Sequence, residues 1–160
     1  MHSITAEPLL EKSFSAYGDV IERGENPSTL INQGNCERYN DLVTLDFYKG
    51  RVGISVFRAT PYTLPVTLPM MERHPLGTQA FIPLDQHPFL VVVADDLDGS
   101  PSQPRVFLTN GRQGVNYARN TWHGVLTPIT GEGLFVVIDR IGDGDNLEEH
   151  WFERSYQITL

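Results

Sequence analysis

The chain has 160 residues, of which 40% are hydrophobic and 20% are charged, values typical of a folded globular protein rather than a disordered one. Its formal net charge of −8 argues against a nucleic-acid-binding protein, because such proteins contact phosphates through lysine and arginine. A small anionic substrate is still compatible with this charge, since a local pair of arginines can bind it.

Cysteine usage and the apolar segments indicate where the protein acts. The one cysteine, Cys36, cannot form an intramolecular disulfide and fits a reducing cytoplasm. We interpret it as a small buried side chain rather than a nucleophile. Residues 1–8 lack the basic start and apolar run of a signal peptide, and the longest apolar stretches, 89–94 and 134–138, have the length of strands rather than membrane spans. We therefore expect a soluble cytoplasmic protein that forms one domain over residues 1–160.

The first predicted element is a short N-terminal helix. Pro8 suits a first helical position, and Gly18 supplies a stop. Between them, apolar residues recur at helical spacing: Leu9, Leu10, Phe14 and Tyr17.

The rest of the chain is predicted to be short strands, because 14 glycines and 11 prolines punctuate it at frequent intervals. The predicted strands are 19–22, 43–48, 52–58, 70–73, 79–83, 89–94, 105–108, 114–117 and 134–140. A brief helix over 146–154 and a last strand over 156–160 complete the prediction. Many short strands without crossover helices favour an all-β sandwich or barrel.

The segment around residue 72 is the first to carry chemistry. In a strand, residues two apart share a face, so Glu72 and His74 point together while Arg73 points away. A proline and a glycine within 75–77 predict a turn, which can return Gln79 to the neighbourhood of His74.

This segment is similar to the first motif of cupin-type barrels, which has two histidines one residue apart and a carboxylate about five residues further on. Here the same slots hold Glu72, His74 and Gln79. Their carboxylate, imidazole and amide groups can bind a borderline divalent ion. The alternative is a buried ion pair between Glu72 and His74, with Gln79 on the strand surface. The residues alone leave both open.

A second constellation lies in residues 109–123, where a glycine-rich turn and a short strand lead to Trp122 and His123. His123 occupies the slot of the single histidine that completes a cupin site. Trp122 would form an apolar wall, and its N–H needs a hydrogen-bond partner if buried. Core or surface roles remain the alternative for this pair. The other histidines are expected to be solvated: His2, His87 and His150.

Five segments together carry a family resemblance: 14–22, 37–39, 72–83, 110–123 and 138–140. They resemble the ureidoglycolate lyase family over nearly the whole chain. One departure concerns the Trp-His pair, because some members continue with His-Pro where this chain has Gly124 and Val125. A role for a second adjacent histidine is therefore not transferable.

The resemblance implies an all-β, cupin-like double-stranded β-helix (a jelly-roll barrel) with a short N-terminal helix, and a homodimer. It implies a lyase that converts (S)-ureidoglycolate to glyoxylate and urea in allantoin breakdown. It also implies a divalent metal, with Ni²⁺ favoured, whose candidate ligands are Glu72, His74, Gln79 and His123.

The expected reaction needs a base, an acid and a clamp for the substrate's carboxylate. Glu72, His74 and His123 are the candidate acid–base residues. Arginine suits the clamp because its planar guanidinium binds a carboxylate through two hydrogen bonds. The candidate substrate-binding residues are Arg38, Tyr39, Arg73, Gln79, Asn116, Tyr117, Trp122 and Arg140. Arg38, Tyr39 and Arg140 rest on the resemblance, and Arg140 and its neighbour Asp139 could equally form an ion pair or a turn.

Two other functions remain open from the sequence. One is an amidohydrolase that releases ammonia from the same substrate, and the other is a non-catalytic cupin that binds a small acid. A sugar-nucleotide isomerase of cupin fold is disfavoured, because the acidic composition offers little basic surface for a diphosphate.

Overall fold

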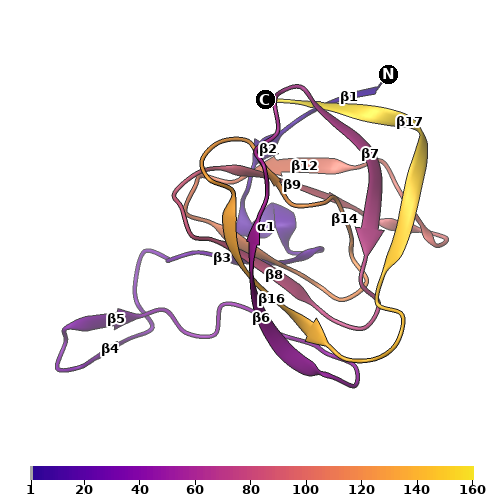
Figure 1. The fold of residues 1–160 in the computed structure, drawn as a ribbon. Helices are drawn as coiled ribbons and strands as arrows, with labels where there is room; N and C mark the ends of the chain where they lie inside the picture. Colours follow the sequence, from indigo (N-terminus) through magenta and orange to yellow (C-terminus); the bar gives the residue numbers. More distant parts are fainter. Residues whose placement is uncertain (1) are drawn as a thin grey trace.

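The computed structural model describes residues 2–160, and nearly all of its regular structure is β-strand (Figure 1). The larger sheet has eight strands. In spatial order they are β1 (His2–Thr5), β17 (Glu148–Thr159), β7 (Val66–Arg73), β14 (Trp122–His123), β9 (Phe89–Ala94), β12 (Arg105–Leu108) and β2 (Glu7–Pro8), with β15 (Thr127–Pro128) also paired to β9.

The second sheet has five strands. Their spatial order is β3 (Gly18–Ile21), β13 (Gly114–Tyr117), β8 (Gln79–Pro83), β16 (Leu134–Ile141) and β6 (Arg51–Arg58). Two small hairpins are formed by β4 (Thr29–Ile31) with β5 (Cys36–Arg38), and by β10 (Asp96–Leu97) with β11 (Ser100–Pro101).

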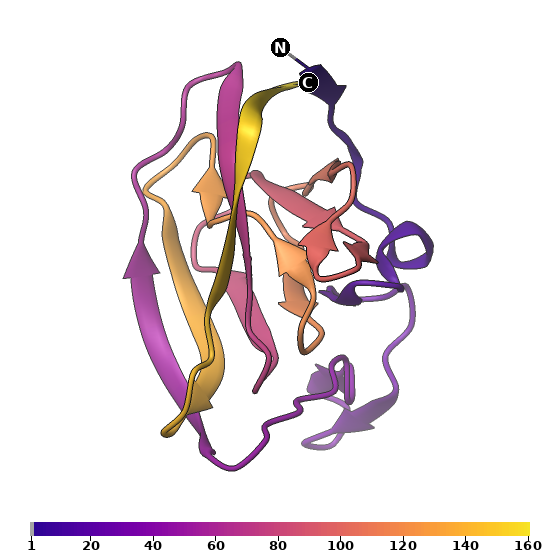
Figure 2. The same ribbon diagram turned by 90° about the vertical axis from the view of Figure 1, so that its right-hand side faces the viewer.

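The larger sheet curls back on itself. Its first and last strands, β1 and β2, are consecutive in the chain and separated only by Ala6. Because β1 pairs with β17 while β2 pairs with β12, the N-terminal segment joins the two ends of the sheet. The result is a nearly closed barrel, with both chain ends side by side (Figures 1 and 2). The prediction of an all-β, cupin-like barrel is confirmed.

Strand β9 is shared by two hydrophobic cores, because all six of its residues are buried. Alternate side chains point to opposite faces of a strand. Phe89, Val91 and Val93 belong to a cluster that also contains residues of β8, β13 and β16, so this core lies between the two sheets. The intervening residues belong to a second cluster, which includes β7, β17 and Ile4. The uninterrupted apolar run in the sequence reflects burial on both faces.

The N-terminal helix is confirmed but shorter than predicted. Helix α1 (Glu11–Phe14) has one buried residue, Phe14. Pro8 does not start the helix, because it lies in β2 opposite Leu108, and Leu9 donates its backbone N–H to the same strand. Pairing with β12 thus overrides the helical spacing of this segment.

The predicted C-terminal helix over 146–154 is wrong. Glu148–Thr159 forms one strand, β17, which pairs with β7 on one side and β1 on the other. The pairing with β7 shifts register between Trp151 and Tyr156. Pro69 falls in this interruption of the ladder, where its missing N–H costs no paired hydrogen bond. The many helix-forming residues of the segment gave the wrong signal.

The predicted strand over 43–48 is also wrong. Within it the structure has only an isolated bridge between Phe47 and Gly77. The segment is held by side chains instead, since Thr44 donates its backbone N–H to Asp19 and Asp46 donates its own to Thr78.

The hairpin of β4 and β5 was not predicted, and it projects from the body of the molecule (Figure 1). Cys36 lies in it and is only partly buried, so the expectation of a buried cysteine is not met. Among the described residues, no helix is long and apolar enough to cross a membrane.

Candidate functional site

Three potential metal ligands converge between the two sheets. His123 on β14 pairs with Glu72 on β7, so the two side chains share a face, and His74 follows directly after β7. One ligand atom from each residue lies within 4.8 Å of the others. Nε2 of His74 is 3.9 Å from Oε1 of Glu72, and the two imidazole rings are 5.1 Å apart. The fold therefore brings both sequence constellations to one place.

Both imidazole rings are oriented by backbone carbonyls. Nδ1 of His74 is 2.7 Å from the carbonyl oxygen of Asn146, and Nδ1 of His123 is 2.8 Å from that of Gly124. A carbonyl only accepts, so each Nδ1 carries the hydrogen and each Nε2 presents a lone pair. Both Nε2 atoms are buried without a hydrogen-bond partner among residues 2–160. This is the arrangement of metal-ligating histidines.

Gln79 faces the same space from the second sheet. It pairs with Tyr117 across β8 and β13, so both side chains lie on the inner face. The Gln79 amide donates to Asp139 Oδ2 at 3.2 Å, which turns its Oε1 away from that carboxylate. This Oε1 is buried and has no partner within the described chain. Asp139 therefore orients Gln79.

Tyr117 forms an aromatic wall beside the histidines. Its ring stacks on His123, with 4.3 Å between centroids and 5° between planes. Burial, together with the negative charge of Glu72, raises the pKa of the Tyr117 hydroxyl. The group thus stays protonated and can donate a hydrogen bond.

The pKa values of the other two groups shift in opposite directions. Burial, reinforced by His74, lowers the pKa of His123 to about 3, so this imidazole is neutral near pH 7. Burial raises the pKa of Glu72, with nearby Glu149 adding to the rise and His74 opposing it. Glu72 is consequently a better proton acceptor than an ordinary surface carboxylate.

A cavity of about 380 Å³ opens beside Glu72, large enough for a small organic acid. It is lined mostly by apolar residues, among them Tyr62, Leu68, Met70, Val125 and Trp151. A larger cavity of about 760 Å³ lies elsewhere and contacts none of the three ligating residues. Glu72 lines the smaller cavity, whereas His74 and His123 line neither, so we place the candidate site at Glu72.

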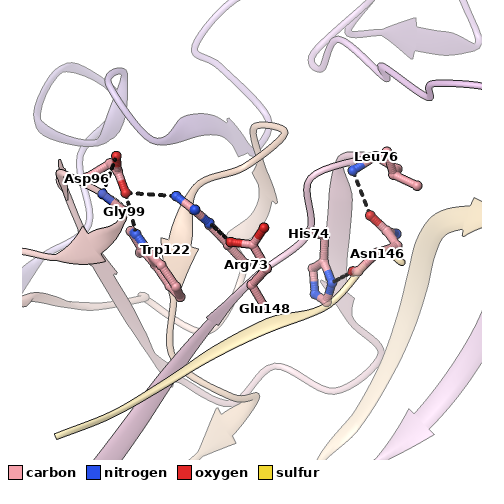
Figure 3. A network of polar contacts seen from close by, with 8 residues as sticks. All are labelled: Arg73, His74, Leu76, Asp96, Gly99, Trp122, Asn146 and Glu148. Carbon is pink, nitrogen blue, oxygen red and sulfur yellow. Dashed lines mark hydrogen bonds and ion pairs between the residues drawn. The ribbon is translucent and has the colours of Figure 1, made fainter. Parts of the chain in front are cut away.

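Arg73 and Trp122 lie on the opposite face of β7 and β14, behind the site (Figure 3). Arg73 forms ion pairs with Asp96 at 2.7 Å and Glu148 at 2.5 Å, and its guanidinium lies 4.4 Å from the Trp122 ring. The Trp122 N–H donates to Asp96 at 2.8 Å, so its expected need for a partner is confirmed. Neither side chain faces the histidines.

The Arg140 side chain is also fully engaged in hydrogen bonds to the backbone. Its buried guanidinium donates to four backbone carbonyl oxygens, those of Tyr48, Lys49, Gly142 and Asp143. Of the two roles left open for it, the structure shows that of holding turns together. It is therefore not free to bind a substrate carboxylate.

The structure does not bring the remaining predicted residues to the site. Arg38 is exposed at the end of β5, and the neighbouring Tyr39 donates its hydroxyl to Glu37 at 3.0 Å. Asn116 points away from the inner face, and its amide donates to Asp19 and to the Thr44 carbonyl.

The solvated histidines are confirmed in two cases of three. His2 and His87 are exposed. His150 is partly buried, with its ring against Trp122 and Phe152, because it lies in β17 rather than in the predicted helix.

Asn146 is a site residue that the sequence did not predict. Its backbone carbonyl holds His74, and its side-chain oxygen accepts the Leu76 N–H at 2.7 Å (Figure 3). These two hydrogen bonds hold the turn that carries His74. No local pattern signals this role, since Asn146 stands in a polar, glycine-containing loop 72 residues further along the chain.

Comparison with known proteins gives one consistent result. The family described as ureidoglycolate lyase matches residues 1–159. The chain is 52% identical to a ureidoglycolate lyase of Chelativorans sp. (strain BNC1), covering 100% of the chain and 98% of the relative. It is 53% identical to one of Rhodobacter capsulatus over 94% of both chains. It is 47% identical to one of Brucella abortus, covering 99% of the chain and 95% of the relative.

Proposed function

The chain belongs to the ureidoglycolate lyase family, and on that basis we propose that it cleaves (S)-ureidoglycolate into glyoxylate and urea in the breakdown of allantoin. The observation that carries the proposal is the convergence of two imidazole lone pairs and the Glu72 carboxylate beside a small cavity. As the resemblance implies, the enzyme would act as a cytoplasmic homodimer, with residues 1–160 forming one domain.

Three residues would hold a divalent ion. The buried, unpartnered Nε2 atoms of His74 and His123 and the carboxylate of Glu72 suit such an ion, and Oε1 of Gln79 is a candidate fourth ligand. Imidazole and carboxylate ligands are compatible with Ni²⁺, the ion favoured by the resemblance. When bound, the ion supplies a positive charge that attracts the substrate's carboxylate and lowers the pKa of its hydroxyl.

Glu72 is the proposed base. The substrate carbon bears a hydroxyl, a carboxylate and the ureido nitrogen. Glu72 removes the hydroxyl proton, the oxygen's electron pair forms the carbonyl of glyoxylate, and the carbon–nitrogen bond breaks. The electrons of that bond pass to nitrogen, which takes a proton to give urea. No water is consumed. Burial raises the pKa of Glu72 in the metal-free site, and a carboxylate oxygen that the ion does not occupy would accept the proton and return it to the leaving nitrogen.

Tyr117 and His123 would position the substrate. The Tyr117 hydroxyl, kept protonated by burial, can donate a hydrogen bond to the ureido carbonyl. Tyr117 stacks on His123, so each ring restrains the orientation of the other. The site is therefore preorganised before the substrate binds. Arg73 and Arg140 have other partners and Arg38 lies away from the site, so none of the three predicted arginines is placed to bind the carboxylate.

The test is incubation with racemic ureidoglycolate, with glyoxylate, urea and ammonia assayed in parallel. Equal glyoxylate and urea without ammonia is the expected result. Ammonia would identify an amidohydrolase, and no product above the spontaneous rate would identify a binding protein. Treatment with EDTA should abolish turnover and Ni²⁺ should restore it, whereas full activity in EDTA would rule out the metal's part.

Two histidine variants localise the chemistry. His74→Ala should lower kcat by at least about 100-fold, the scale of a lost acid–base or ligating group. His87→Ala is the matched control, because His87 is exposed and contacts only Thr130 among the hydrogen-bond partners found. Equal activity of the two variants would exclude His74 from the site.

A further inference from the structure

Two polar side chains extend the inner face of the second sheet beyond its hydrophobic part. Phe81 of β8 lies opposite Val137 of β16, and both belong to the core between the sheets. Residues two apart share a face of a strand, so Gln79 and Asp139 continue this face. Gln79 is only 8% exposed. A buried amide therefore stands beside a carboxylate where the neighbours along both strands are hydrophobic.

The Gln79 amide has a hydrogen-bond partner on one side only. Its Nε2 donates to Oδ2 of Asp139 at 3.2 Å, whereas its Oε1 is buried and accepts no hydrogen bond from residues 2–160. Leaving a buried carbonyl oxygen unpaired costs stability, and nearly all such groups in native proteins have a partner. The oxygen therefore points to a group that the chain itself does not supply.

Asp139 decides which end of the amide is left free. The oxygen and nitrogen ends of a glutamine amide are almost equal in shape, so a rotation of 180° about the last side-chain bond exchanges them. An ionised carboxylate only accepts hydrogen bonds, so the rotated amide would set Oε1 against Oδ2 and lose its one bond. Asp139 forms no ion pair among residues 2–160, so no neighbouring cation competes for its carboxylate.

The free oxygen joins the lone pairs of the two histidines. Gln79 lies opposite Tyr117, whose ring stacks on His123. The buried side-chain atoms without a hydrogen-bond partner in the described chain include Nε2 of His74, Nε2 of His123 and Oε1 of Gln79. Each of these atoms presents a lone pair and none presents a hydrogen. Such a set suits a cation, whereas an N–H in place of the oxygen would repel it.

We propose that Asp139 is a positioning residue of the metal site, which acts through Gln79 and does not touch the ion. By holding Nε2, it makes the second sheet present an oxygen to the ion that the larger sheet would hold. Its negative charge also polarises the amide and so makes Oε1 a stronger ligand. The inference rests on the ion of the proposed function and is independent of the reaction that the ion assists.

The test is Asp139→Asn, with Ni²⁺ binding to the EDTA-treated protein measured by titration calorimetry. Asparagine keeps the shape but can donate its own N–H to Oε1, which allows the amide to turn its nitrogen toward the ion. We expect the Kd for Ni²⁺ to rise by about 10–100-fold, the usual effect of losing a group that orients a ligand. Glu132→Gln is the matched control, because it removes one charge from an exposed position just before β16. Its Kd should equal that of the wild type.

A double variant separates orientation of the amide from a purely structural role. When Asp139→Asn is combined with Gln79→Glu, the asparagine donates to the new carboxylate, which still presents an oxygen to the ion. The pair also regains the charge it has in the wild type. This double variant should recover most of the Ni²⁺ affinity that Asp139→Asn loses. A side chain needed only for folding would not be rescued by changing its neighbour.

Either of two results would overturn the inference: equal Kd values for the wild type and Asp139→Asn, or a double variant that binds no better than Asp139→Asn. Circular dichroism checks the fold of each protein. Should Asp139→Asn unfold, NMR of the wild type answers the same question. One Gln79 side-chain NH₂ proton should stay protected from exchange when Zn²⁺ binds, and lost protection would mean that the amide has turned.

The same titrations distinguish this inference from the proposed function. A wild-type protein that binds no Ni²⁺ would overturn the metal site and the role of Asp139 together. A wild-type protein that binds Ni²⁺ but forms no glyoxylate from ureidoglycolate would refute the catalytic proposal alone.

Discussion

At the scale of single residues, the chemistry of the site depends on which imidazole nitrogen carries a hydrogen. Backbone carbonyls settle this for both histidines, since those of Asn146 and Gly124 each accept from an Nδ1. The two Nε2 lone pairs then face the same buried space as Glu72. Only one of the two carbonyls belongs to a residue adjacent to its histidine, so the orientation of His74 depends on a distant loop.

Asn146→Ala tests that dependence. Loss of the side-chain oxygen leaves the partly buried Leu76 N–H unpaired, which should destabilise the protein by about 1–3 kcal/mol. Loosening of the turn should also weaken Ni²⁺ binding by about 10–100-fold, measured by calorimetry. Asn146→Asp keeps the acceptor and should recover most of the affinity. If both variants bind Ni²⁺ like the wild type, Asn146 does not position His74.

The lowered pKa of His123 predicts a pH effect on the metal-free protein. The folded state holds this pKa at about 3, against 6.5 for an ordinary histidine. Between these values the unfolded chain binds the extra proton, so stability falls as the pH drops from about 6.5 toward 3. The contribution is fully present above pH 6.5.

Glu72 contributes in the opposite sense, because a carboxyl with a raised pKa loses stability as the pH rises. The comparison with His123→Gln isolates the histidine. Urea denaturation of the metal-free proteins should show a shallower acid-side decline for the variant. Parallel declines would mean that His123 is not buried in its neutral form.

At the scale of elements, Arg73 joins three strands of the larger sheet to the β10–β11 hairpin. It lies on β7, stacks on Trp122 of β14, and pairs with Asp96 of β10 and Glu148 of β17. Figure 3 shows this network. Because side chains alternate along a strand, it lies on the opposite face of β7 and β14 from Glu72 and His123 and fixes the strands that carry them. Its partners Asp96 and Glu148 are about half exposed, which limits the strength of each ion pair.

Arg73→Met distinguishes this supporting role from substrate binding. Methionine keeps an apolar stem over Trp122 but removes both ion pairs and the cation–π contact, so we expect a loss of about 1–2 kcal/mol in stability. KM for ureidoglycolate should stay close to the wild-type value. Arg154→Met, an exposed change on β17, is the control. A large rise in KM with unchanged stability would instead support contact between Arg73 and the substrate.

The elements also show which signals in the sequence were sufficient. Strands β8, β9, β13 and β16 were predicted within one residue, because apolar runs and turn residues bound them. The spacing of Glu72 and His74, with His123 in the second motif, correctly grouped three residues of the candidate site. The failures at 43–48 and 146–154 share one cause, since pairing across the fold decides those segments and local propensity does not. The hydrogen bonds of Asn146 to the turn that carries His74, and those of Arg140 to backbone carbonyls, likewise join segments that only the folded structure brings together.

At the scale of the whole molecule, the site draws on segments that meet only in the folded state. Glu72 and His74 come from one end of β7, His123 from β14 about fifty residues later, and Gln79 from the second sheet. The unfolded chain offers no such grouping. An ion held by these residues must therefore bind the native state far more tightly than the unfolded chain. Such preferential binding raises the free energy of unfolding.

This linkage predicts that Ni²⁺ raises the Tm of the EDTA-treated protein. At a free ion concentration of about 100 times Kd, the gain is about 2.7 kcal/mol, and calorimetry at several concentrations measures it. His74→Ala should abolish the shift, because it removes one of two imidazole ligands, while His87→Ala should keep it. Gln79→Ala reports on the second sheet: a reduced shift would make its Oε1 a ligand that ties the two sheets together. An unchanged shift would confine the ion to the larger sheet, and the absence of any shift in the wild-type protein would refute the metal site.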